Sequence, residues 1–196
     1  MNKHFAALLI AGIASLAACG GGGGGGTTPT PGAGGGSTPP PPAGVGAQTI
    51  GMALPNGAIG TVNTAPFGLV GGYTQSVYSQ VIAFPPGTTI TLKNLSTNTP
   101  HTLNVLSTTG FPSNPSLSTT AAGGTSLATG FSSGAISPGG TMSITLTTPG
   151  TYYIGCAFHY TSNGMRDVVM VSANATPGPQ ATPQPSTGSG GGGGGY

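Results

Sequence analysis

Turn-forming residues limit the fold of this chain more than any other feature. In the middle of the chain, Gly, Pro, Ser and Thr recur every few positions. No long segment there repeats apolar residues at the 3.6-residue spacing of a helix. Elements between closely spaced turns are short, which favours strands. The clearest turn signals are Pro85-Pro86-Gly87, Pro138-Gly139-Gly140 and Pro149-Gly150.

Between these turns, apolar and polar side chains alternate as they do in half-buried strands. The segments that we expect to form strands are 76–84, 89–92, 142–146, 151–154 and 168–171. Short strands at this spacing are typical of a β-sandwich or barrel. The sequence therefore predicts an all-β fold.

The ends of the chain differ from the middle in composition. The chain has 39 Gly and 19 Pro among 196 residues, and many of them cluster near the two termini. Glycine repeats behave as flexible coil and proline runs as stiffer spacers. We therefore expect a flexible tether over residues 19–47, one folded domain over residues 48–173 and a disordered tail over residues 174–196.

The N-terminus has the layout of an export signal. Lys3 precedes an apolar run from Phe5 to Ala18, which is too short for a permanent membrane span. The run ends in Leu16-Ala17-Ala18-Cys19, which resembles the lipobox of bacterial lipoproteins. That resemblance implies a signal peptide over residues 1–18 and a lipid on Cys19. It also implies a periplasmic or cell-surface location, at the outer membrane in a Gram-negative cell. An ordinary signal peptide is the alternative.

Charged residues are nearly absent, and this excludes whole classes of function. The chain has three basic residues and one acidic residue. A nucleic-acid-binding protein needs several Lys or Arg side chains to neutralise phosphates, so we expect no nucleic-acid partner. Paired-carboxylate catalysis needs two acidic side chains and is excluded as well.

The remaining chemistry lies in a small set of possible metal ligands. Beyond the predicted signal and Cys19, the chain has two histidines, His101 and His159, and one cysteine, Cys156. A lone exported cysteine is a free thiol, an intermolecular bridge or a metal ligand. One thiolate, two imidazoles and a weakly bound methionine are the ligands of blue-copper sites. The sequence therefore predicts one type 1 copper held by His101, Cys156, His159 and Met165.

The spacing of these ligands resembles that of the cupredoxin family, with plastocyanin and pseudoazurin the most similar group. The resemblance covers residues 75–172. It rests on a Pro-Gly-Thr-Tyr strand that runs into Cys156-Ala157-Phe158-His159, followed by Met165 and preceded by His101. It implies a cupredoxin-like Greek-key β-sandwich. In that group four residues usually separate the last His from the Met, whereas here five do, and Thr102 stands where the family commonly has Asn.

The resemblance also implies a function, which is one-electron transfer by copper cycling between Cu(I) and Cu(II). Redox partners such as cytochromes or oxidases would dock near His159, beside Ala157, Phe158 and Tyr160. Copper storage or delivery is one alternative, and a metal-free surface or filament module with the same fold is another. An enzyme is not expected, because multicopper enzymes need more histidines than this chain has.

Overall fold

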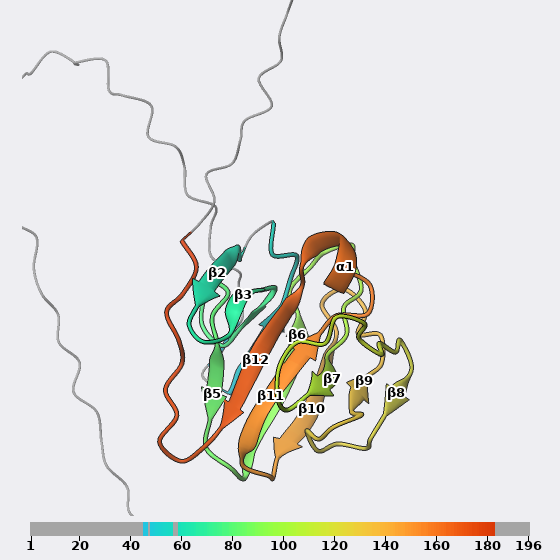
Figure 1. Cartoon of the computed structure of the whole chain (residues 1–196). Helices are drawn as coiled ribbons and strands as arrows, with labels where there is room; N and C mark the ends of the chain where they lie inside the picture. Colours follow the sequence, from blue (N-terminus) through green and yellow to red (C-terminus); the bar gives the residue numbers. More distant parts are fainter. Residues whose placement is uncertain (1–44, 47, 57–58, 183–196) are drawn as a thin grey trace, which may run out of the picture. The chain divides into compact units, whose positions relative to one another are not determined.

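The structure is a computed structural model that describes residues 45–46, 48–56 and 59–182 (Figure 1). The predicted signal peptide, Cys19, most of the predicted tether and residues 183–196 lie outside the described residues. Among the described residues, no helix is long and apolar enough to cross a membrane.

Two β-sheets form the described part of the chain, which confirms the predicted all-β sandwich. In the first sheet, β6 pairs in parallel with β1 and antiparallel with β10. Neighbouring strands in this sheet are not consecutive in the sequence, so the chain crosses between the sheets. In sheet order, the strands are β10 (Thr141–Leu146), β6 (Thr88–Asn94), β1 (Thr49–Met52) and β4 (Tyr73–Thr74).

The second sheet is built around the antiparallel pair of β11 and β12. In sheet order, its strands are β2 (Thr61–Thr64), β3 (Gly68–Gly71), β12 (Arg166–Val171), β11 (Gly150–Gly155), β7 (Asn104–Ser107), β9 (Ser132–Ser133) and β8 (Ala121–Ala122). An eighth strand, β5 (Ile82–Phe84), pairs in parallel with β12. The register of β11 against β7 shifts between Tyr153 and Ile154, shortly before Cys156.

The main hydrophobic core lies between the two sheets. Alternate residues of β6, β10, β11 and β12 point into it, as the period of two in a strand requires. Each fully buried Ile or Leu side chain stabilises the folded state by about 1.5–3 kcal/mol relative to an exposed one. Core side chains from the first sheet include Ile50, Ile90, Leu92, Ile144 and Leu146, and those from the second include Val105, Tyr152, Ile154, Val169 and Val171.

One predicted strand, 76–84, is wrong over most of its length, because only β5 is a strand there. The preceding residues form a turn that is held by the side chain of Thr74. The hydroxyl of Thr74 donates to the carbonyl oxygen of Tyr78 at 2.7 Å and accepts the N–H of Ser76 at 3.1 Å. Such local side-chain bonds offer the backbone an alternative to a strand ladder.

The first part of the predicted tail is also structured. Residues 174–182, here called the C-terminal strap, lie along residues 78–81. The N–H of Gly178 donates to Val81 O at 2.8 Å, and the N–H of Ala181 donates to Ser79 O at 2.7 Å. The side chain of Ala181 is buried. The folded part of the chain therefore extends nine residues beyond the predicted boundary at residue 173.

Candidate metal centre

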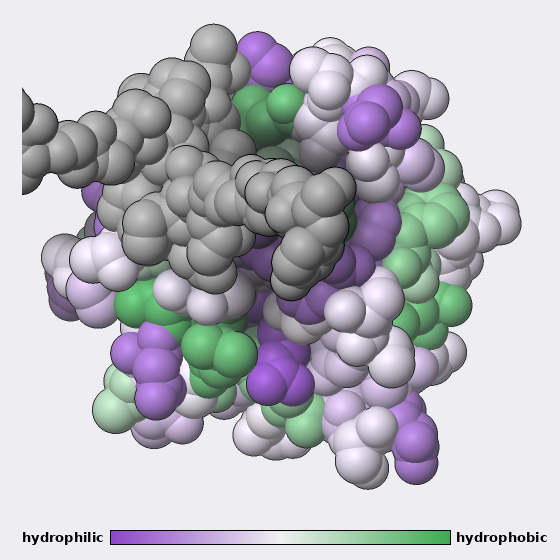
Figure 2. All heavy atoms as spheres, turned by 90° about the horizontal axis from the view of Figure 1, so that it is seen from above, coloured by the Kyte–Doolittle hydropathy of each residue, from purple (hydrophilic) through white to green (hydrophobic). Residues whose placement is uncertain are grey.

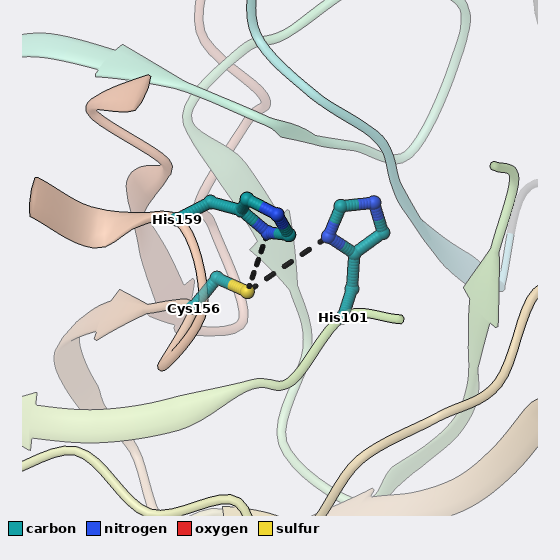
Figure 3. A group of neighbouring side chains, drawn as sticks. All are labelled: His101, Cys156 and His159. Atoms are coloured by element: carbon teal, nitrogen blue, oxygen red, sulfur yellow. Dashed lines mark hydrogen bonds between the residues drawn. The ribbon is translucent and has the colours of Figure 1, made fainter. Parts of the chain in front are cut away.

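Three of the predicted ligands meet at the end of the sandwich where β11 ends and β12 begins (Figure 3). Cys156 follows the last residue of β11 directly, as the sequence predicted. His101 lies three residues before β7 and is tied by backbone hydrogen bonds in both directions to Ile136. His159 ends the short segment that begins at Cys156.

The loop from His159 to Met165 contains one helical turn, α1 (Tyr160–Asn163), which the sequence did not predict. Gly164 ends this turn with a positive φ of 66°, and its N–H donates to Tyr160 O. The N–H of Met165 then donates a hydrogen bond to His159 O at 3.1 Å. The helical turn therefore brings Met165 back beside the segment that carries Cys156 and His159.

The three donor atoms face one another. Cys156 Sγ lies 3.4 Å from His159 Nδ1 and 3.8 Å from His101 Nδ1. All three donor atoms lie within 4.8 Å of one another. Metal–nitrogen and metal–sulfur bonds of about 2.0–2.3 Å would place ligands of one ion at separations of this order. The residues present therefore fit a single metal ion.

The two imidazoles are held in the form that binds metals. Burial and, in smaller part, the nearby His159 lower the pKa of His101 to about 4. Burial also lowers the pKa of His159 below its usual value. Both rings are therefore neutral at neutral pH, and a neutral imidazole has the free nitrogen lone pair that a metal needs.

Thr102 ties the two ligand segments together. Its backbone N–H donates to Cys156 Sγ at 3.4 Å, and its hydroxyl oxygen accepts the N–H of Ala157 at 2.8 Å. The Asn104 side chain donates to the same hydroxyl at 2.8 Å, and the phenol of Tyr73 donates to the Thr102 carbonyl at 2.8 Å. The hydroxyl of Thr102 thus connects the segment of His101 to the segment of Cys156, and the Asn104 side chain holds that hydroxyl in place.

Met165 is fully buried in the same core cluster as Cys156. Its carbonyl oxygen accepts the N–H of Cys156 at 3.1 Å. Its side chain packs against Gly72, where a Cβ atom would overlap Met165 Cγ. The structure therefore places Met165 beside the ligand segment, and its role as the axial ligand stays a prediction.

One carboxyl group is buried near the site. Asp167 is fully buried on β12, and its Oδ1 accepts the N–H of Val168 at 2.7 Å. Burial raises the pKa of Asp167 well above its usual value, although the Val168 bond opposes this shift. The pKa of Tyr73 is raised by burial and, in smaller part, by Cys156 and Asp167.

A β-sandwich that gathers one thiol and two imidazoles at one end has the donor set of a mononuclear copper site of the blue type. Solved structures similar to this chain include amicyanin, a purple cupredoxin and auracyanin. A Cu(I) form of an amicyanin mutant matches at 17% identity and a TM-score of 0.37, with 65% of this chain and 83% of that chain covered. No family model and no curated protein matches this chain.

Three further similar structures come from named organisms. A purple cupredoxin from Nitrosopumilus maritimus matches at 20% identity and a TM-score of 0.38, covering 63% of this chain and 98% of its own. A reduced auracyanin from Roseiflexus castenholzii matches at 21% identity and a TM-score of 0.35, with 65% of this chain and 98% of that chain covered. A copper-containing nitrite reductase from Thermus scotoductus also matches, over 31% of its length.

The sequence reasoning missed the polar residues around the ligands. Asn104 is buried, and Ser96 lies within hydrogen-bond distance of His101. Both are short polar residues within five positions of a predicted ligand, and that proximity is the signal that was available. Cys19, the predicted lipidation site, lies outside the described residues.

Proposed function

We propose that this chain is a blue-copper electron carrier with one copper ion held by His101, Cys156 and His159, and with Met165 as the weak axial ligand. The observation that carries the proposal is the convergence of one sulfur and two nitrogen donors within 4.8 Å. The bound copper would accept and release one electron at a time.

The residues of this chain would keep that site rigid and dry. Cys156 and His101 are fully buried, and the backbone of Thr102 donates to the sulfur. The Thr102 hydroxyl links the upstream ligand segment to the loop that carries the others. Ligands fixed in this way change little between oxidation states, which favours fast electron transfer.

The test is to add Cu(II) to the purified protein and to record the visible spectrum. We expect an intense blue colour that ascorbate bleaches and that oxidation restores. Cys156→Ser should fold and remain colourless, because the thiolate–copper bond gives the colour. A folded wild-type protein without colour, or colour that persists in Cys156→Ser, contradicts the proposal. Copper that binds without reversible bleaching favours storage or delivery.

Redox partners would dock where the ring of His159 approaches the surface. His159 is partly exposed, and Phe158 beside it is 39% exposed, with the two ring centroids 6.0 Å apart. Figure 2 shows hydrophobic residues in separate patches among polar ones on the face that it views. With so few charged residues, the docking would rest on apolar contacts of this kind.

Apolar docking predicts that the rate of electron exchange depends only weakly on ionic strength. Electron exchange with a cytochrome or an oxidase should vary less than about twofold between low and physiological ionic strength, because exposed charges contribute little. Phe158→Ser should slow the exchange, whereas Ser162→Ala, on the exposed side of α1, should not. A rate that falls steeply with salt contradicts apolar docking.

We also infer export and lipid attachment at Cys19 from the sequence alone. The support is the basic start, the apolar run and the Leu-Ala-Ala-Cys ending. Mass spectrometry of the membrane fraction should find a lipid on Cys19, and Cys19→Ala should release the protein from the membrane. Processing at another site without a lipid contradicts the inference.

A carrier rather than an enzyme is the proposal that these residues support. Within the described part of the chain, His101, Cys156 and His159 form the single group of this kind. A second copper site for catalysis would need further histidines, which the chain does not supply.

A further inference from the structure

The ring of His101 presents its two nitrogens to different neighbours. Nδ1 faces Cys156 Sγ at 3.8 Å, and Nε2 lies 2.8 Å from the hydroxyl oxygen of Ser96. A neutral imidazole carries a hydrogen on one nitrogen only. The ring can therefore offer Nδ1 to a metal only when Nε2 carries the hydrogen, and that hydrogen is then within reach of the Ser96 hydroxyl oxygen.

We propose that Ser96 is the positioning residue for His101, and that its hydroxyl makes the site hold Cu(II) more tightly relative to Cu(I). The inference rests on the proposed copper function. By accepting the Nε2 hydrogen, the hydroxyl fixes the tautomer and the orientation of the ring. Such a bond also raises the basicity of the coordinating nitrogen, which favours the more highly charged ion.

Ser96 is itself held in place by the sheet. Asn94, at the end of β6, is fully buried, and its Oδ1 accepts the N–H of Ser96 at 2.9 Å. The Nδ2 group of Asn94 donates to Thr99 O at 2.8 Å and to Ile136 O at 2.9 Å. One buried side chain therefore fixes both ends of the turn that presents the hydroxyl.

The backbone of His101 is fixed by separate bonds. Its N–H donates to Ile136 O at 3.1 Å, and its carbonyl oxygen accepts the N–H of Ile136 at 2.8 Å. The main freedom left to the residue is rotation of its side chain. The bond to Ser96 restricts that rotation, so Ser96 acts on the ring and not on the backbone of His101.

The variants for the test are Ser96→Ala, which removes the acceptor, and Ser96→Thr, which keeps a hydroxyl. Thr97→Ala is the matched control, because it removes an exposed hydroxyl from the next position of the same turn. The first measurement is the dissociation constant for Cu(II), Cu(I) and Zn(II), obtained by competition with chelators. The second is NMR of the Zn(II) or Cu(I) protein, in which an Nε2 hydrogen held by a hydrogen bond exchanges slowly with water.

In Ser96→Ala we expect Cu(II) binding to weaken by about 10- to 100-fold and Cu(I) binding to weaken less. Each tenfold difference between the two raises the reduction potential by about 59 mV. The slowly exchanging Nε2 hydrogen should disappear. Ser96→Thr should restore affinity, potential and the protected hydrogen, and Thr97→Ala should match the wild type.

Each outcome decides between the two claims. Unchanged affinities and a retained protected hydrogen in Ser96→Ala overturn the role of Ser96 and leave the copper function standing. A wild-type protein that binds Zn(II) but gives no blue Cu(II) form overturns the copper function, while the Zn(II) measurements still test Ser96. A folded wild-type protein that binds none of the three ions overturns both.

Discussion

Acidifying the metal-free protein should destabilise it through His101. Burial lowers the pKa of His101 to about 4 in the folded protein, whereas an unfolded chain has a histidine pKa of about 6.5. Between these values the unfolded chain binds a proton that the folded protein excludes. The stability that neutral His101 confers is therefore complete above about pH 6.5 and is lost as the pH falls towards 4.

The size of this effect follows from the same two values. A pKa difference of about 2.5 corresponds to at most about 3.4 kcal/mol, at 1.36 kcal/mol for each pKa unit. The neighbouring His159 ring is partly exposed, so solvent screens a charge that forms at His101. We therefore expect His101 to account for about 1–2 kcal/mol of the lost free energy of unfolding.

Urea denaturation of wild type and His101→Gln, under reducing and metal-free conditions, isolates this contribution. Asp167 acts in the opposite direction, because its raised pKa makes the folded protein more stable as the pH falls. Since both proteins contain Asp167, the difference between them cancels its effect. Wild type should lose more stability than His101→Gln between about pH 7.5 and about pH 4.5. Equal losses in the two proteins refute the reasoning.

Three further substitutions test the surroundings of the site. Thr102→Val removes the oxygen that accepts hydrogen bonds from the N–H of Ala157 and from the Asn104 amide, and it should cost roughly 1–3 kcal/mol in urea denaturation, because both donors lose their partner. Gly72→Ala should cost about 1–2 kcal/mol more than Gly87→Ala. Both glycines have positive φ, but a Cβ atom overlaps Met165 only at Gly72 and meets nothing within 4 Å at Gly87. Met165→Leu should lower the free energy of unfolding by less than about 1.5 kcal/mol. It should also change the reduction potential of the copper form, measured by voltammetry. An unchanged potential argues against an axial role for Met165.

The sequence was sufficient for the fold class and for naming three side chains that converge. Alternation and turn residues located the central strands, because one buried face imposes a period of two. The scarcity of His and Cys left few ways to assemble a metal site, and the three that were singled out do converge.

Features that depend on side-chain bonds between distant or irregular segments were not predictable. The segment 76–84 alternates like a strand, yet Thr74 and Gln75 bind its backbone and turn it. The helical turn after His159 is too short for any periodic pattern. The contact between His101 and Ser96 could not be predicted without knowing where Asn94 places the turn.

The C-terminal strap has a consequence for where the folded domain ends. Its amides at Gly178 and Ala181 donate to the carbonyl groups of Val81 and Ser79, and the side chain of Ala181 is buried. Without the strap, these carbonyl groups would lose their backbone donors, and the surface that Ala181 covers would be exposed. A chain shortened to residue 173 should therefore unfold at a lower urea concentration than one that ends at residue 182.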